Sequence, residues 1–187
     1  GAGFSVDGAS EKNEDVTKKS SDENEDAEGF YGMGSVFAEV GLTDKISVGI
    51  DLVPHALESE EVENEQEVAG SSNVTNRAEV HVNDMMTYYA TLALTDNIYL
   101  KAGMVEADVL TKEVLNTGGA YPDTSIDGVT VGIGYNNNMA NGMFVRVEAN
   151  YSEFDSVSVT NTNDSTKSVT IDGVESMGAR LSIGKSF

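Results

Sequence analysis

The chain repeatedly alternates apolar residues with small or polar ones, the pattern of a β-strand with one apolar face. In the closing segment "MGARLSIGK", every second residue from Met177 to Ile183 is apolar. The same alternation occurs in residues 35–42, 46–53, 86–94, 98–104, 129–135 and 143–151, and more briefly in 2–6. These segments predict eight strands, of which the first is expected to be truncated at the N-terminus.

The connections between these segments alternate between short and long. Tight turns are expected at "TDK" (43–45), "TDN" (95–97) and "NNNMAN" (136–141), because Asn and Asp tolerate turn conformations. Strands that are joined by such turns must be antiparallel. Long polar loops are expected at 7–29, 54–78, 109–125 and 155–170, and the like charges of "ESEEVENEQE" predict a flexible loop.

An even number of strands, with short turns at one end and long loops at the other, describes a transmembrane β-barrel. The prediction is therefore an all-β fold: a single domain over residues 1–187, forming an eight-stranded antiparallel up-and-down transmembrane β-barrel. In such a barrel the apolar residues face lipid. A soluble acidic β-sandwich that serves as a binding module remains the alternative, with the apolar residues facing a core between two sheets.

The less apolar face of the segments favours the barrel. It mixes glycines such as Gly49, Gly103 and Gly134 with large aromatic residues such as Tyr89 and Phe144. A narrow barrel interior needs both small and large side chains to fill its cross-section. Aromatic residues on the apolar face near the strand ends fit interfacial girdles, namely Tyr88, Tyr135, Tyr151 and Phe187.

Charges on the less apolar face are few and balanced. Three are negative and three are positive, and all six fall at similar heights along their strands: Glu39, Asp51, Glu148, Lys101, Arg146 and Arg180. Because a buried charge without a partner is costly, these residues are predicted to pair as an ionic layer inside the lumen.

Composition narrows the possible partners. The chain has 11 Lys and Arg against 32 Asp and Glu, a net charge of −21, so nucleic acid is an unexpected partner. Loosely bound divalent cations fit the acidic loops, but no defined metal site is expected. The chain has no cysteine, and no apolar run is long enough for a transmembrane helix. It begins at Gly1, and we expect a mature or trimmed product.

With its "LTDxI" turns and its ending "ARLSIGKSF", the chain resembles the small eight-stranded outer-membrane β-barrels of Gram-negative bacteria, the OmpA/OmpX-type superfamily. The resemblance implies a monomer in outer-membrane lipid that is inserted by the β-barrel assembly machinery. It implies that the C-terminal assembly signal comprises Ala179, Leu181, Ile183 and Phe187. Lys185 departs from the family pattern, in which an apolar or aromatic residue is usual.

Several functions fit such a barrel. The first expectation is a structural or surface-interaction protein that displays acidic extracellular loops, since eight strands enclose only enough space for side chains. A narrow porin-like channel for small solutes or ions is the alternative. An enzyme is not expected, because His55 and His81 both lie near strand ends without an obvious nucleophile beside them. Neither a catalytic site nor a cofactor is therefore predicted.

Overall fold

The computed structural model describes residues 2–19, 22–58, 62–66, 74–114, 119–166 and 168–187. In these ranges the regular secondary structure consists of strands. They are β1 (Ala2–Lys19), β2 (Asp22–Gly41), β3 (Ile46–Leu52), β4 (Leu57–Glu58), β5 (Val62–Gln66), β6 (Val74–Ala93), β7 (Ile98–Val114), β8 (Thr124–Asn138), β9 (Met143–Phe154), β10 (Val157–Thr160), β11 (Ser168–Ile171) and β12 (Glu175–Lys185). The described residues include no helix that is long and apolar enough to cross a membrane.

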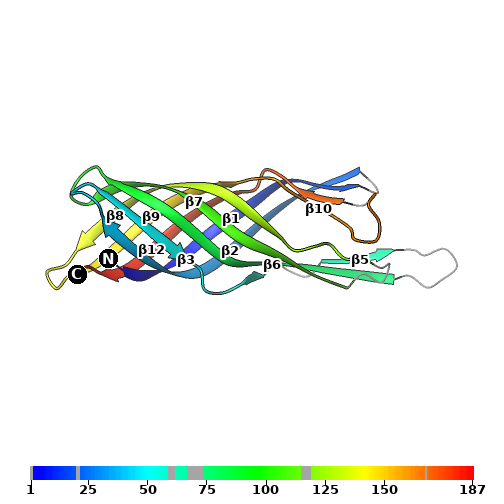
Figure 1. The fold of residues 1–187 in the computed structure, drawn as a ribbon, viewed down its shortest axis with the longest axis horizontal. Coiled ribbons are helices and arrows are strands. Elements are labelled where there is room, and N and C mark those ends of the chain that lie inside the picture. Colours follow the sequence, from blue (N-terminus) through cyan, green and yellow to red (C-terminus); the bar gives the residue numbers. More distant parts are fainter. Residues whose placement is uncertain (1, 20–21, 59–61, 67–73, 115–118, 167) are drawn as a thin grey trace.

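Eight of the described strands form a closed antiparallel ring in the order β1, β2, β3, β6, β7, β8, β9, β12. The ring closes because β1 pairs on one side with β2 and on the other with β12, from Ala2 opposite Lys185 to Lys12 opposite Glu175. Both termini and the tight turns lie at one end of the barrel (Figure 1). The predicted all-β, up-and-down architecture is therefore confirmed.

The predicted long loops are wrong in much of their extent, because the strands continue beyond the apolar segments. Most of residues 7–29 belongs to the β1–β2 hairpin, and β6 and β7 also extend well past their apolar parts. Residues 62–66 of the expected flexible loop form β5, paired with β6, whereas 59–61 and 67 lie outside the described residues. The register of the first hairpin gives a physical reason, since its lysines lie opposite acidic residues: Lys12 and Glu28, Lys18 and Glu23, Lys19 and Asp22.

The apolar face of the barrel strands points outward. Val131, Ile133 and Leu181 expose 52%, 53% and 59% of their surface, whereas Phe144 on the opposite face exposes 3%. A closed ring with its apolar side chains outside contradicts the soluble-sandwich alternative, which needs those side chains between two layers. An apolar exterior is instead the arrangement that hydrocarbon requires.

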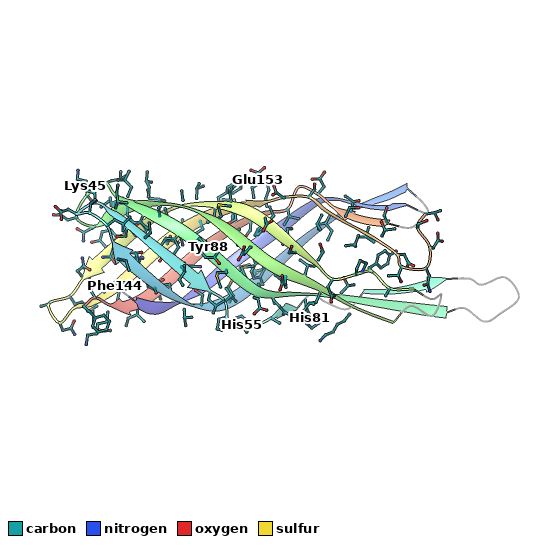
Figure 2. The ribbon with its side chains drawn as sticks, viewed as in Figure 1. Lys45, His55, His81, Tyr88, Phe144 and Glu153 are labelled. Atoms are coloured by element: carbon teal, nitrogen blue, oxygen red, sulfur yellow. The ribbon has the colours of Figure 1, made fainter. Side chains whose placement is uncertain are left out.

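Polar and aromatic residues mark the two edges of this apolar belt. Tyr135 lies near the end with the tight turns and Tyr88 near the other edge, where its hydroxyl donates a hydrogen bond of 3.3 Å to Glu106 Oε1. Beyond Tyr88 the outer face becomes acidic, with exposed Glu106 and exposed Glu153 (Figure 2). The belt between these aromatic residues is therefore the segment that faces lipid.

Candidate functional site in the barrel lumen

Large aromatic side chains in the lumen lie over glycines on neighbouring strands. Each aromatic residue is in register with its glycine, so that the ring occupies the space that a side chain at the glycine would need. The pairs are Tyr89 with Gly49, Tyr99 with Gly134, and Phe144 with Gly184. The mixture of small and large residues that was noted in the sequence therefore packs as complementary pairs.

Arg146 lies among these rings and pairs with Glu39. Its Nη1 lies 3.0 Å from Glu39 Oε2, and its Nη2 lies 3.3 Å from Oε1, so the pair is bidentate. The guanidinium carbon lies 4.9 Å, 5.1 Å and 5.6 Å from the ring centroids of Tyr99, Phe144 and Phe37. Such stacking suits the planar guanidinium and helps to hold it inside the lumen.

A second ion pair joins Lys101 of β7 to Glu148 of β9. Lys101 Nζ lies 2.9 Å from Glu148 Oε1, and both side chains are buried. The Tyr99 hydroxyl donates a hydrogen bond of 2.6 Å to Glu148 Oε2, so both carboxylate oxygens have a donor. Lys101 Nζ also lies 4.5 Å from the centroid of the Tyr89 ring, and the Tyr89 hydroxyl donates to Glu39. The two ion pairs thus belong to one network.

The third ion pair joins Arg180 of β12 to Asp51 of β3. The structure therefore brings together all six charged residues that the sequence singled out, as three pairs of opposite sign. Sequence reasoning missed the hydroxyls of Tyr89 and Tyr99 as partners of the carboxylates. The alternation pattern could have indicated this, because both tyrosines lie on the same, less apolar face of the strands as the charged residues.

A cavity of about 60 Å³ borders the ion pairs inside the barrel. Asp51, Lys101 and Arg180 contribute to its lining, together with polar residues such as Thr130 and Ser152. At roughly 10–15 Å³ for each water, this space holds only a few water molecules. The cavity next to the ionic network is therefore small, and its lining mixes polar and charged side chains with apolar ones such as Met33 and Phe154.

The two histidines lie in different environments. His55 is exposed, and its Nε2 accepts a hydrogen bond of 3.0 Å from the backbone amide of Gly34. His81 on β6 is buried, with 4% of its surface exposed. Among the described residues, no three or more His, Asp or Glu side chains are grouped so that they could hold a metal ion.

The residues of the predicted assembly signal lie at the C-terminal end of the chain. Ala179 and Leu181 are exposed on the outer face of β12, Ile183 is half-buried, and Phe187 is fully exposed. Lys185 Nζ lies 5.4 Å from the centroid of the Phe187 ring. Their role in assembly stays a prediction.

Comparisons with known proteins give matches of structure. No protein-family model and no curated protein matches the chain. The structure of Ail, the attachment invasion locus protein of Yersinia pestis, solved with the heparin analogue sucrose octasulfate, is similar with a TM-score of 0.52 at 11% identity, covering 100% of this chain and 97% of that one.

Two further structures are similar at lower scores. Neisserial surface protein A has a TM-score of 0.46 at 13% identity, covering 100% of this chain and 99% of that one. The outer membrane protease OmpT of Escherichia coli has a TM-score of 0.39 at 9% identity, covering 100% and 96%. The likeness to Ail shows that this chain has the fold of the small outer-membrane β-barrels, and its own apolar belt is the surface that such a location requires.

Proposed function

We propose that this protein is a non-enzymatic barrel of the bacterial outer membrane that anchors an acidic, strand-rich surface for interactions outside the cell. The observation that supports the proposal is the side-chain packing around Arg146 in the lumen, where its guanidinium lies over three aromatic rings and is paired with Glu39. A lumen closed by side chains suits an anchor better than a channel. The fold alone does not decide between enzymatic and non-enzymatic roles, so the absence of catalysis is part of the proposal.

The charge of the chain suggests the kind of surface partner. Ail was solved with a heparin analogue, which is a polyanion, whereas this chain carries a net charge of −21. Electrostatic repulsion disfavours polyanions here, so we infer partners that are cationic or that bind through loosely held divalent cations. The protein is further proposed to be a monomer that the β-barrel assembly machinery inserts, with nucleic acid excluded as a partner.

Conductance in planar lipid bilayers tests the closed lumen. The purified protein should show little or no steady current, because the aromatic residues and ion pairs fill the barrel at one level. The double variant Phe37→Ala/Phe144→Ala removes two rings beside Arg146 and should raise the conductance. The matched control Val147→Ala changes the exposed outer face of β9 and should leave it unchanged. Large, reproducible currents through the unmodified protein would overturn the proposal.

A narrow channel for ions or small solutes is the second candidate, favoured by the cavity that Arg180 and Asp51 line with charged side chains. Movement of this one ion pair could connect the cavity with the rest of the lumen. If the unmodified protein conducts and Arg180→Gln changes its ion selectivity, the channel replaces the anchor as the conclusion. A conducting protein with unchanged selectivity in that variant would contradict a path along this ion pair.

A further inference from the structure

The seam between β2 and β3 is a short stretch of pairing in the barrel wall. The two strands pair over six positions, from Val36 opposite Leu52 to Gly41 opposite Ser47. Beyond Val36, β2 continues as far as Asp22, whereas β3 ends at Leu52. Pro54 follows shortly after and has no amide hydrogen to continue a ladder. The hydrogen-bonded pairing of β2 with β3 therefore ends at Val36 and Leu52.

The His55 side chain accepts a backbone hydrogen bond from β2 just beyond the last β2–β3 pair. Along a strand, the amides of alternate residues point to the same side, so Gly34 continues the series of Val36 and Ala38. The Gly34 amide donates a hydrogen bond of 3.0 Å to Nε2 of His55. One imidazole nitrogen thus replaces the backbone carbonyl that a longer β3 would have supplied.

This bond fixes the protonation state of the ring. An amide N–H can only donate, so Nε2 must carry a lone pair and no proton. The other nitrogen, Nδ1, lies 3.2 Å from the carbonyl oxygen of Ala56, and in this tautomer it carries the proton and donates it. A second proton on the ring would occupy Nε2 and turn two donors toward each other.

The seam borders the luminal cavity. Met33 of β2 and Val53, which follows β3, both line the cavity, together with Met85 of β6. The Val53 amide donates to the carbonyl of Met85 at 3.0 Å, so this side of the seam is tied to β6. The β2 side is held at Gly34 by His55.

We propose that His55 is a proton-sensitive latch, which holds β2 against the segment after β3 when the ring is neutral and releases it when the ring is protonated. The ring contacts two backbone groups, the Gly34 amide on β2 and the Ala56 carbonyl on its own segment. Of the charged groups on neighbouring elements, Asp51 is paired with Arg180 in the lumen, Glu58 and His81 lie opposite each other in the β4–β6 pairing, and Asp84 lies at the bulge of β6. The latch is independent of whether the lumen conducts.

Amide exchange of the full chain in lipid nanodiscs, followed by NMR, tests the latch. We compare the protection factor of the Gly34 amide at about pH 7.5 and about pH 5.5, a range in which histidine side chains titrate, after correcting for intrinsic exchange. In the unmodified protein the protection should fall roughly tenfold at the lower pH, the size expected for one lost hydrogen bond. The amide of Ala38, within the β2–β3 ladder, should stay protected at both values.

Three variants make the test specific. His55→Gln keeps an oxygen acceptor that does not titrate, so Gly34 should stay protected at both pH values. His55→Ala should leave Gly34 unprotected at both values, while Ala38 reports that the barrel is folded. His81→Gln removes the other histidine and should keep the pH response. Either the same pH response in His55→Gln or no pH response in the unmodified protein would overturn the latch.

Discussion

At the scale of single residues, the lumen tolerates charge because every one of the six predicted residues has a partner of opposite sign. Burying two charges costs several kcal/mol each, and their attraction offsets this only with good geometry and further hydrogen bonds. Glu39 has such additional hydrogen bonds, because Arg146 and the Tyr89 hydroxyl both donate to its carboxylate. Removing one partner of a pair should therefore lower the free energy of unfolding more than removing both partners.

The Arg146–Glu39 pair allows that comparison. Arg146→Met removes two hydrogen bonds and the opposite charge from Glu39 inside the lumen, and it should lower the free energy of unfolding by about 3–5 kcal/mol. The double variant Glu39→Gln/Arg146→Met removes both charges and should recover much of that loss. Urea unfolding in detergent, followed by circular dichroism, measures both. Equal stability of the single variant and the unmodified protein would show that the pair is not desolvated.

The positions of these charges could be predicted from the sequence, but their partners could not. Alternation along each strand places Asp51 and Arg180 on the inner face, and it needs no knowledge of the rest of the fold. Their pairing joins β3 to β12, two strands that are not neighbours in the ring. The stagger of the strands around the closed barrel determines which side chains meet across the lumen. This stagger cannot be deduced from the alternation of residues along the sequence.

At the scale of strands, complementary packing of glycine and aromatic residues sets the shape of the lumen. Gly134 lies under the Tyr99 ring, and a Cβ at this position would overlap that ring. Gly134→Val should therefore displace Tyr99 and destabilise the barrel by about 1–3 kcal/mol, the usual cost of overpacking. The matched control is Ala149→Val, which adds a similar volume to the exposed outer face of β9. A loss as large in the control would contradict the account.

Strand length is where the sequence prediction was wrong. Apolar alternation ends where the strands leave the lipid, so residues 7–19 and 22–29 looked like a loop. Backbone pairing continues these strands beyond the apolar segments, and several residues of opposite charge lie opposite each other across the hairpin. A pattern search for apolar residues cannot detect such pairs, because the register that brings them together depends on the hairpin itself.

Lys12 tests this register, since it lies opposite Glu28 of β2 and opposite Glu175 of β12. Lys12→Glu places three acidic residues side by side across three strands and should destabilise the protein by roughly 0.4–2 kcal/mol, taking two cross-strand pairs together. The effect should shrink in high salt. Lys45→Glu makes the same charge change in a tight turn at the other end of the barrel and should cost less (Figure 2). Thermal unfolding in detergent compares the two variants.

At the scale of the whole molecule, the barrel has three zones along its axis. Tight turns and both termini lie at one end, an apolar belt surrounds the middle, and acidic strand extensions lie at the other end (Figure 1). Arg146 with its aromatic rings and the Lys101–Glu148 ion pair lie inside the belt. This division of the molecule rests on one claim, that the alternating apolar residues face lipid while their neighbours face the lumen.

Spin-label accessibility in lipid bilayers measures that claim directly. A nitroxide at Val131, which is 52% exposed, should collide readily with oxygen and poorly with a water-soluble nickel chelate, since oxygen concentrates in hydrocarbon. A nitroxide at the adjacent Thr130, which is 7% exposed, should collide poorly with oxygen because it points into the packed lumen. Low oxygen accessibility at Val131, equal to that at Thr130, would contradict the account, because it would place the apolar face inside the protein.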